Sequence, residues 1–523
     1  MPAKGRRRPR LELDASLLLV RSGSDSWRFA TDDDEAFGRP LGEWPIRVAH
    51  DGSRGDHCVA SRDLCAGALI CCEEPFAQTV HDSMDDAVCH VCYEFIRAEP
   101  YTTCTACGQV RYCSQRCATL GQSAHHSECF VLRQLAASAA SKAASGSMGA
   151  SSGVRGLRFF MRLVNRIAEE PDALRVLEEN LQEHFGDAAP ERRRFLLEMA
   201  AKVNRLVPPP NRMGDELRLA HLISRAHVNL HSVSDCGGVT YGSGLYPRYG
   251  SKFNHSCAPS AVVSFHGRTW RLHTLRAVGR GEEITIAYTD LYAGRAQRQA
   301  ALRATKSFEC ACPRCLHPLP SDADIDGWVA DEAPEGGAGA AAAGRLGPDA
   351  RAAVEGRWRD AVEAELATVS ADTAARAARV AERVLEQSAG KLRERHAVRH
   401  RARRLLAHAL DASPSPAKPR AGGATEQQQQ QQQQQLVAVL ERCVDDLQHA
   451  LPSRCHPELA YFRHWLAAAL RRLATTAADE PSSSAPPVLL ARAEREARAA
   501  AEALATAYGH DHPTVRRWRR GSW

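Results

Sequence analysis

Residues 89–129 of the chain read CHVCYEFIRAEPYTTCTACGQVRYCSQRCATLGQSAHHSEC. Four metal-ligand spacings, C-x2-C, C-x2-C, C-x3-C and H-x3-C, are formed by Cys89, Cys92, Cys104, Cys107, Cys113, Cys117, His125 and Cys129. Thiolates at positions i and i+3 reach one ion across a tight turn, and a site with four protein ligands and no open position is structural rather than catalytic. The eight ligands therefore predict two closed, tetrahedral zinc sites.

Spacing alone leaves two features of these sites open. His126 competes with its neighbour His125 for the role of ligand, and the eight ligands allow either sequential or interleaved pairing. Because so short a segment cannot bury a hydrophobic core, we expect zinc binding to supply much of its folding free energy.

The compartment decides how the 18 cysteines of the chain are interpreted. The N-terminus is basic, but the apolar stretch behind it is interrupted by Glu12 and Asp14 and is too short for a signal peptide. We therefore expect a reducing compartment, where disulfides rarely persist and metal sites explain clustered cysteines better. The basic residues themselves indicate either a nuclear import signal or a solvated end of the chain: Lys4, Arg6, Arg7, Arg8 and Arg10.

A second cysteine cluster lies further along the chain. Cys310, Cys312 and Cys315 form C-x-C-x2-C, which is one ligand short of a tetrahedral zinc site. Cys257 is the candidate for the fourth ligand, because it ends the polar run that starts at Asn254. Most of the remaining cysteines are expected to be small core residues.

Length and composition bound the class of protein. A chain of 523 residues predicts two to four domains, and 44% hydrophobic with 25% charged residues is typical of a globular chain. The net charge of +6 is small for this length and does not indicate a nucleic-acid binder. No apolar run approaches the roughly 20 residues that cross a bilayer, so we expect no membrane span.

Residue patterns predict strands on both sides of a helical middle. Strands are expected at 46–49, 58–61 and 68–73, and again near 262–265, 270–272 and 284–288. Apolar residues at helical spacing predict helices around 157–167 and 195–199, and helices throughout the last third of the chain. These last helices favour stacked helical hairpins, with a plain bundle as the alternative. Four segments read as linkers: 136–153, 336–344, 414–435 with its nine glutamines, and 475–487.

Together these motifs resemble the SET-and-MYND family of protein lysine methyltransferases. The segment from Cys89 to Cys129 resembles a MYND zinc finger, and the family's further motifs follow in order: Asn254-His255-Ser256-Cys257, Gly281-Glu282-Glu283-Ile284 with Tyr288, and the post-SET C-x-C-x2-C. The resemblance covers residues 45 to 318 well and 350 to 515 loosely. It implies interleaved zinc pairing: Cys89, Cys92, Cys113 and Cys117 on one ion, and Cys104, Cys107, His125 and Cys129 on the other.

The resemblance implies an α+β multidomain fold, with a β-rich SET domain interrupted by the MYND finger, a post-SET zinc site and a C-terminal α-helical, tetratricopeptide-like domain. The expected domains are a basic tail (1–44), the first part of the SET domain (45–88), the finger (89–129), a linker and helical insert (130–220), the SET core (221–300), the post-SET motif (301–318), a linker (319–349) and the helical domain (350–523) with a disordered insertion (412–435). Three structural zinc ions are expected.

The implied reaction is methyl transfer from S-adenosylmethionine to a lysine amine of a histone or another protein. Such an in-line displacement needs an aligned and dry site, and burial beside a sulfonium lowers the pKa of the attacking amine. Tyr288 is the implied catalytic tyrosine, which orients the methyl group and walls the lysine channel. The implied cofactor-binding residues are Arg54, Gly55, Asn229, Asn254, His255, Tyr288 and Phe308.

Three positions depart from the family pattern. Ser260 stands where an asparagine braces the loop, Lys306 replaces a second channel tyrosine, and His231 replaces a third aromatic wall residue. A cation in the channel is expected to repel a substrate lysine unless the pocket is rearranged. These changes bear on catalytic competence and on the number of methyl groups added.

A catalytically weak or inactive adaptor is the alternative hypothesis. Its MYND finger would dock proline-rich peptides and its helical domain would hold a partner protein. Direct DNA binding is not favoured, since Arg97, Arg111 and Arg116 are too few for a basic groove. The family implies a location in the nucleus, the cytoplasm or both.

Overall fold

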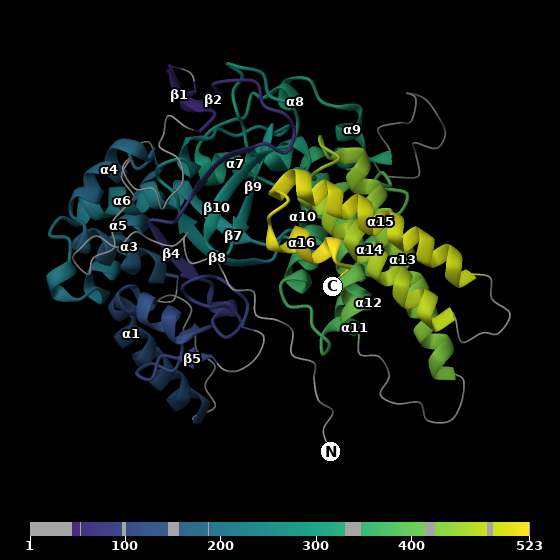
Figure 1. Ribbon diagram of the computed structural model, residues 1–523, viewed down its shortest axis with the longest axis horizontal. Helices are drawn as coiled ribbons and strands as arrows, with labels where there is room; N and C mark the ends of the chain where they lie inside the picture. The colour runs from purple at the N-terminus through teal and green to yellow at the C-terminus, as the bar shows by residue number, and fades with distance from the viewer. Residues whose placement is uncertain are drawn as a thin grey trace. The chain divides into compact units, whose positions relative to one another are not determined.

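The computed structural model describes residues 44–52, 54–96, 101–144, 156–186, 188–329, 347–413, 424–477 and 485–521. The basic tail predicted at 1–44 lies outside these residues except for Trp44, as does Arg97. The chain forms two compact units, drawn in Figure 1. The first comprises Met1–Ile46, Ile70–His231 and Ser243–Ser251, and the second comprises Arg47–Leu69, Ser232–Gly242 and Lys252–Trp523.

Helices form most of the first unit. They are α1 (Gln115–Ala144), α3 (Arg158–Glu169), α4 (Asp172–Asn180), α5 (Pro190–Leu206) and α6 (Glu216–Asn229), with short 3-10 turns η4 (Asp82–Met84) and η5 (Pro209–Asn211). The helix predicted around 157–167 is confirmed, because Phe160, Leu163 and Ile167 all point into one buried apolar cluster. Asp215 starts α6 by accepting hydrogen bonds from the Leu217 and Arg218 backbone N–H groups.

Short strands accompany these helices, and two of them, at 230–234 and 240–245, cross in sequence from one unit to the other. A two-stranded antiparallel ladder joins β5 (Thr102–Thr103) to β6 (Arg111–Tyr112), with Thr102 opposite Tyr112. β4 (Ala77–Val80) lies beside β8 (Thr240–Leu245), and β8 lies beside β7 (Leu230–Ser234). The sequence pattern missed these last three strands. β3 (Leu69–Glu73) matches the strand predicted at 68–73, and η6 (Gly250–Lys252) is a single 3-10 turn.

Two strand pairs begin the second unit. β1 (Ile46–Asp51) pairs with β2 (Gly55–Ala60), and β9 (Ala261–His266) pairs antiparallel with β10 (Thr269–Thr274). Trp270 on β10 is fully buried and stacks on Phe253, with ring centroids 5.8 Å apart. With β3, these four strands confirm five of the six predicted strands in kind and position.

The strand predicted at 284–288 was wrong. Within the described residues this segment makes one isolated bridge, a parallel one from His255 to Ile286, and the residue just before it, Glu283, makes an antiparallel bridge to Val59. The β-branched residues that suggested a strand serve burial instead, since Ile284 and Ile286 are almost fully buried. Residues 283–288 thus cross between two neighbours and pair for one residue with each.

Most of the described chain after β10 is helical. After α7 (Arg295–Lys306), α8 (Pro313–Leu316) and α9 (Pro320–Asp326) come α10 (Pro348–Leu366), α11 (Ala374–Ser388), α12 (Ala397–Ala412), α13 (Ala424–Ala450), α14 (Pro457–Ala477), α15 (Ala485–Tyr508) and α16 (Pro513–Arg519). Consecutive helices from α10 to α16 pack on one another, in green to yellow in Figure 1. Their shared core includes Leu405, Leu440, Phe462 and Leu470.

Three predicted linkers are partly helical. The insertion predicted as disordered over 412–435 was wrong for 424–435, because α13 begins at Ala424 and contains the glutamine run. The linker predicted from residue 136 was wrong up to 144, where α1 ends, and the linker at 319–349 contains α9. Glutamine and alanine have good helix propensity, and Asp322 orders α9 through its buried ion pair with Arg314. Residues 145–155, 330–346, 414–423 and 478–484 lie outside the described residues.

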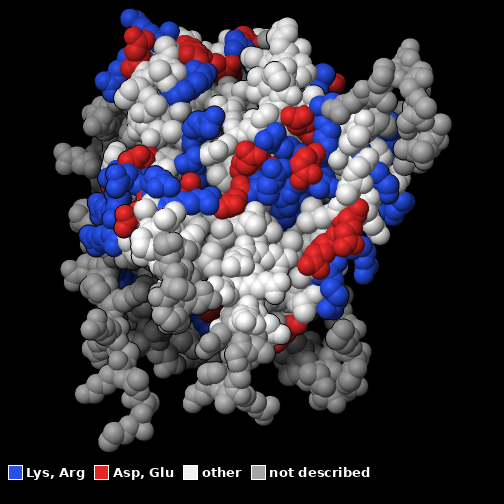
Figure 2. All heavy atoms as spheres, turned by 90° about the vertical axis from the view of Figure 1, so that its right-hand side faces the viewer, with Lys and Arg blue, Asp and Glu red and all other residues white. Residues whose placement is uncertain are grey.

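The surface carries charge of both signs. Figure 2 shows one face, on which cationic and anionic side chains are intermixed, in keeping with the net charge of +6. Among the described helices, none has both the length and the apolar character needed to cross a membrane.

Candidate functional site

The first cysteine cluster lies in the first unit and joins Cys89, Cys92, Cys113 and Cys117. Their sulfur atoms all lie within 4.8 Å of one another, with Cys92 Sγ 3.5 Å from Cys113 Sγ. Cys89 and Cys92 lie on a tight turn, Cys113 directly follows β6, and Cys117 lies in the first turn of α1. Four converging thiolates form a closed tetrahedral set of the kind that holds structural zinc.

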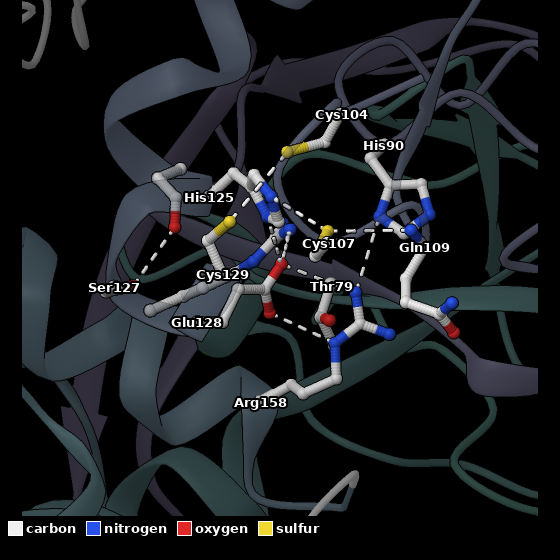
Figure 3. Close-up of polar contacts among 12 residues, drawn as sticks. Thr79, His90, Cys104, Cys107, Gln109, His125, Ser127, Glu128, Cys129 and Arg158 are labelled. Carbon is white, nitrogen blue, oxygen red and sulfur yellow. Dashed lines mark hydrogen bonds and ion pairs between the residues drawn. The ribbon is translucent and has the colours of Figure 1, made fainter. Parts of the chain in front are cut away.

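The second cluster joins Cys104, Cys107, His125 and Cys129 (Figure 3). His125 Nε2 lies 3.4 Å from Cys107 Sγ, and Cys104 Sγ lies 3.8 Å from Cys129 Sγ. Cys104 directly follows β5, whereas His125 and Cys129 are four residues apart on one face of α1. His126 is exposed and lies outside the cluster.

The two clusters are interleaved along the chain. The pair Cys89 and Cys92 meets Cys113 and Cys117, and the pair Cys104 and Cys107 falls between them in sequence but belongs to the other cluster. The β5–β6 ladder explains this order. Cys104 and Cys107 lie in the loop between the two antiparallel strands, and the second strand leads the chain back so that Cys113 and Cys117 can meet Cys89 and Cys92. This is the grouping that the family resemblance implies, and sequential pairing is not what the structure has.

A buried carboxylate orients the histidine of the second cluster. Glu128 is fully buried, and its Oε1 lies 3.3 Å from His125 Nδ1. Arg158 Nε and Arg162 Nη2 donate to the same carboxylate at 3.0 and 2.5 Å. Burial opposes ionisation of Glu128, but the charges of Arg162 and Arg158 outweigh it and hold the pKa well below its usual range. The carboxylate fixes Nδ1 as the donor and leaves Nε2 for a metal, an arrangement typical of zinc-binding histidines.

The third cluster lies in the second unit and joins Cys257, Cys310, Cys312 and Cys315. All four sulfur atoms lie within 4.8 Å of one another, with Cys257 Sγ 3.6 Å from Cys315 Sγ. The Cys257 backbone N–H also donates to Cys312 Sγ at 3.3 Å. Cys257 is therefore placed where the sequence analysis expected the fourth ligand.

Arg298 shows that an anionic group belongs at the third cluster. Its side chain is fully buried, and among the described residues its Nε and Nη2 have no oxygen or nitrogen partner. Burial lowers the pKa of Arg298, but the negative charges of Cys257 and Asp322 outweigh it and raise the pKa overall. Four thiolates around a divalent ion carry a net negative charge that a buried guanidinium balances. The residues present thus fit zinc, and each of the three clusters can bind an ion.

A polar clamp in the second unit joins the first strand turn to the Asn-His-Ser-Cys motif. Glu283 accepts from Arg54 Nη1 at 2.6 Å and from Asn254 Nδ2 at 3.1 Å, and Asn254 also lies 3.4 Å from the Arg54 carbonyl oxygen. Asp51 fixes Arg54 from the other side, at 2.6 Å from Nε. Gly55 has φ +67°, a conformation that favours glycine and turns the chain into β2. Three predicted cofactor residues are therefore brought together.

His255 connects Tyr288 to the third cluster. Its Nδ1 accepts the Tyr288 backbone N–H at 2.9 Å, and its Nε2 lies 3.3 Å from Cys257 Sγ. Burial lowers the pKa of His255 to about 4, so the ring is neutral near pH 7. Since both nitrogens are engaged within the fold, His255 has only its backbone and ring face to offer a cofactor.

Tyr288 is held at both ends. Its hydroxyl donates to the Phe253 carbonyl oxygen at 2.5 Å, and burial raises the pKa of the phenol, which stays protonated at neutral pH. The hydroxyl oxygen keeps acceptor capacity after donating its proton. The Tyr288 ring centroid lies 5.4 Å from that of His255, which in turn lies 6.2 Å from that of Phe308. The structure thus places Tyr288, His255 and Phe308 in one aromatic cluster.

Asn229 and His231 belong to the first unit, whereas the other predicted cofactor residues belong to the second. Asn229 ends α6 and donates through Nδ2 to the carbonyl oxygens of Gln182 and Arg225, which leaves its Oδ1 as an acceptor. His231 Nε2 lies 3.2 Å from the Gly250 carbonyl oxygen. Their predicted contacts to a cofactor and to the lysine channel remain predictions.

Ser260 braces its loop, although it stands where the family has an asparagine and was expected to weaken the loop. The fully buried hydroxyl of Ser260 accepts the Thr285 backbone N–H at 2.9 Å, and the Ser260 N–H lies 3.3 Å from Thr285 Oγ1. A reciprocal pair of hydrogen bonds therefore ties the loop to the segment that leads to Tyr288. The short side chain of Ser260 can hold the loop because the hydroxyl of Thr285 provides the second hydrogen bond.

Two functional residues were missed by sequence reasoning. Glu283 and Glu128 both lie inside motifs that the sequence analysis quoted, but neither received a role there. Each glutamate did carry a sequence signal, because a carboxylate placed among residues expected to be buried must be paired with a cation or a hydrogen-bond donor. Naming those partners required the fold.

Comparison with known proteins agrees with this geometry. A family model described as "SET domain" matches residues 55–289. The chain is 26% identical to mouse "Histone-lysine N-methyltransferase SMYD3" over 284 residues, which are 54% of this chain and 63% of that protein. It is 24% identical to "Histone-lysine N-methyltransferase ASHR1" of Arabidopsis thaliana over 296 residues, which are 54% and 58% of the two chains. A "SET and MYND domain-containing protein" of Dictyostelium discoideum is 23% identical over 331 residues, 52% and 60% of the two chains.

The chain is similar to proteins of the SET-and-MYND family. The SET match of residues 55–289 encloses the first two cysteine clusters in sequence. The α+β architecture, with its cysteine clusters and C-terminal helices, is consistent with the architecture of that family. The matched stretches span about three fifths of the relatives' own lengths.

Proposed function

We propose that this chain is a SET-and-MYND protein and an S-adenosylmethionine-dependent protein-lysine N-methyltransferase. One observation carries the proposal: inside the segment that matches a SET domain, Tyr288 is fixed by Phe253 and His255 beside the clamp of Arg54, Asn254 and Glu283. A tyrosine hydroxyl held in this way, next to a polar clamp and an aromatic wall, supports an in-line transfer that needs alignment and exclusion of water.

Residues of the second unit are proposed to bind the cofactor and to orient its methyl group. S-adenosylmethionine, when bound, supplies the electrophilic methyl group. Asn254 and the Arg54–Gly55 turn hold the cofactor, with Phe308 against its adenine. The Tyr288 oxygen, already committed as a donor to Phe253, accepts weak C–H hydrogen bonds and so orients the reacting carbon.

The substrate amine must lose a proton before it attacks. A lysine amine with a reference pKa near 10.4 is almost wholly protonated at pH 7, and burial against Tyr288 and Phe308 lowers that pKa. The aromatic face of Tyr288 then stabilises the methylammonium product through a cation–π contact. His255 serves as a positioning residue, because it fixes the Tyr288 backbone rather than touching the amine.

Zinc has a structural role in this proposal. Two ions hold the finger of residues 89–129, and a third holds Cys257, Cys310, Cys312 and Cys315 next to His255. A closed set of four protein ligands leaves no position for substrate. We therefore assign none of the three ions to the reacting centre.

The proposals for substrate, domains, partners and location rest on the names of relatives and on the family resemblance. Relatives carry the printed names "Histone-lysine N-methyltransferase SMYD3" and "N-lysine methyltransferase SMYD2-B", so the proposed substrate is a lysine of a histone or another protein. We further propose a tetratricopeptide-like domain over 350–523, proline-rich peptides as possible ligands of the finger, and a location in the nucleus, the cytoplasm or both.

Cofactor binding tests the proposal without a known substrate. Calorimetric titration of the zinc-loaded chain with S-adenosylmethionine is expected to show micromolar binding that Asn254→Ala abolishes. Asn180→Ala, at the end of α4, is the matched control and is expected to bind normally. A folded, zinc-loaded protein that binds no S-adenosylmethionine would overturn the proposal and favour the adaptor hypothesis.

A further inference from the structure

Lys306 places an amine of the chain itself on the face of the proposed catalytic tyrosine. The Lys306 Nζ lies 5.1 Å from the Tyr288 ring centroid, within the range of a cation–π contact. Both residues belong to the second unit, as do Phe253, His255 and Phe308 around them. A lysine amine therefore lies where a methyltransferase of the proposed kind needs one.

The backbone around Lys306 is anchored on both sides. Lys306 is the last residue of α7, and Leu302 one turn earlier is almost fully buried. Ser307 then turns the chain in the left-handed conformation, with φ 59°, and its N–H donates to the Arg303 carbonyl oxygen at 3.2 Å. Cys310, four residues after Lys306, belongs to the third cysteine cluster. The side chain thus starts from a fixed point close to Tyr288.

The surroundings of Lys306 also favour a reactive amine. Burial lowers the pKa of Lys306 to about 8, so a substantial fraction of the amine is neutral at mildly alkaline pH. The chain has few lysines compared with its arginines, yet lysine and not arginine stands at this position. Arginine would keep the cation but could not act as a nucleophile at neutral pH.

We propose that Lys306 is a methyl acceptor of the chain's own site, which makes it a site of self-methylation. The inference rests on the proposed function, because it requires S-adenosylmethionine as the methyl donor. The ammonium first loses a proton to solvent. The free electron pair of Nζ then forms a bond to the methyl carbon while the carbon–sulfur bond breaks, and that electron pair stays on sulfur to give neutral S-adenosylhomocysteine. Lys306 ends as a methylammonium.

Methylation would keep the charge of Lys306 and make it bulkier and less strongly hydrated. A methylammonium binds an aromatic face well, so the product is expected to stay on Tyr288. Self-methylation would then change the shape of the channel that an external lysine has to enter.

Mass spectrometry of the full-length, zinc-loaded protein tests this inference. Incubation with S-adenosylmethionine carrying a deuterated methyl group is expected to label the tryptic peptide from Ala304 to Arg314, in which methylated Lys306 resists cleavage. Lys202 on α5 and Lys391 are internal controls and are expected to stay unlabelled. A labelling rate constant that does not change with protein concentration would show transfer within one chain. Lys306→Arg, which keeps the cation, is expected to remove the label.

A second readout does not depend on turnover. S-adenosylhomocysteine, at saturation in calorimetry, is expected to slow acetylation of Lys306 by acetic anhydride at least several-fold and to leave Lys202 unaffected. If the protein binds S-adenosylmethionine but Lys306 gains no methyl group, or if Lys306 is not protected, the inference is overturned while the proposed function stands. If the folded protein binds neither ligand, the proposed function itself fails.

Discussion

The imidazole of His255 joins the backbone of Tyr288 to the sulfur of Cys257. Nδ1 accepts the Tyr288 N–H at 2.9 Å, so the proton of the neutral ring is on Nε2, which lies 3.3 Å from Cys257 Sγ. One side chain thus makes the position of the proposed catalytic tyrosine depend on the third cysteine cluster. Metal loading and cofactor binding are expected to be coupled through it.

Replacing His255 tests this coupling. His255→Phe keeps a ring of similar size but removes both hydrogen-bonding nitrogens, which is expected to cost about 1 to 3 kcal/mol of stability. Affinity for S-adenosylmethionine should fall even when zinc content, measured by atomic absorption, is unchanged. His184→Phe, at a half-buried position of the first unit, is the control and should retain the affinity for S-adenosylmethionine. Unchanged affinity in His255→Phe would contradict the coupling.

Zinc is expected at three ions per chain. Thiolate clusters hold structural zinc tightly enough to supply folding free energy in segments that lack a core. Chelation should therefore expose residues 89–129 to limited proteolysis first, because the finger has only a small apolar cluster around Val110 and Tyr112. Elemental analysis of the purified protein checks the count, and two ions instead of three would exclude one of the clusters.

Glu128 is expected to be the most sensitive carboxylate of the first unit. Glu128→Gln removes the carboxylate charge that pairs with the buried Arg162, while Arg158 keeps its ion pairs with Asp85 and Asp82, and the change is expected to cost about 3 to 5 kcal/mol. It also weakens the orientation of His125, so zinc should leave the finger faster in the presence of a chelator. Urea unfolding and the rate of zinc release are the measurements.

An exposed ion pair provides the comparison for Glu128. Glu179 pairs with Arg175 four residues earlier on α4, and both side chains are more than half exposed. Glu179→Gln is expected to change stability by no more than about 0.5 kcal/mol. Equal losses in the two variants would show that the buried network has no special role.

Glu73 gives the first unit a pH dependence. Burial raises its pKa to about 7, although the carboxylate accepts backbone N–H groups from Arg248, Tyr249 and Gly250 that favour ionisation. A carboxyl whose pKa is higher in the folded than in the unfolded chain binds more protons when folded. Its contribution to stability is therefore complete below about pH 4.5 and is lost as pH rises to about 7.

Glu73→Gln is expected to remove this dependence of stability on pH. The wild-type chain should lose roughly 3 kcal/mol between these two pH values relative to the variant, since one pKa unit corresponds to about 1.4 kcal/mol. Urea titrations at pH 5, 6, 7 and 8 measure the difference. Glu191→Gln, at the exposed start of α5, is the control and should keep the wild-type profile. Parallel profiles for Glu73→Gln and wild type would contradict the assignment.

Ser260 is expected to stabilise the segment that leads to Tyr288. Ser260→Ala removes the acceptor of the buried Thr285 N–H and should cost about 1 to 3 kcal/mol. The melting temperature should fall, and the affinity for S-adenosylmethionine should fall with it. Ser61→Ala, at an exposed position after β2, should change neither quantity.

Much of the site could be predicted from sequence because its signals are local. The cysteine sets follow from spacing, and the interleaved grouping followed from the family resemblance. Long-range partners were out of reach: Glu283 meets Arg54 across 229 positions of the chain, and no local pattern encodes that contact. The error at residues 284–288 has the same origin, because β-branched residues fit both a strand and a buried crossing segment.

The departures from the family pattern were the least predictable part. A missing asparagine suggested a weakened loop, whereas Ser260 and Thr285 share the task. Whether a serine suffices depends on what stands opposite it in the folded chain. The same is true of Lys306, whose neighbour Tyr288 is 18 positions earlier in sequence and comes into reach only through folding.

The glutamine run at the beginning of α13 makes the chain tolerant of changes in tract length. Gln427–Gln435 precede the buried face of the helix, which starts at Leu436 and continues through Leu440 and Leu447. Each residue added to a helix rotates whatever lies beyond it by about 100°, but glutamines added on the N-terminal side extend the free end and leave the register of the leucines unchanged. Homologous chains with longer or shorter runs should therefore pack α13 in the same way, whereas a single residue inserted after Leu436 would turn the apolar face out of the core.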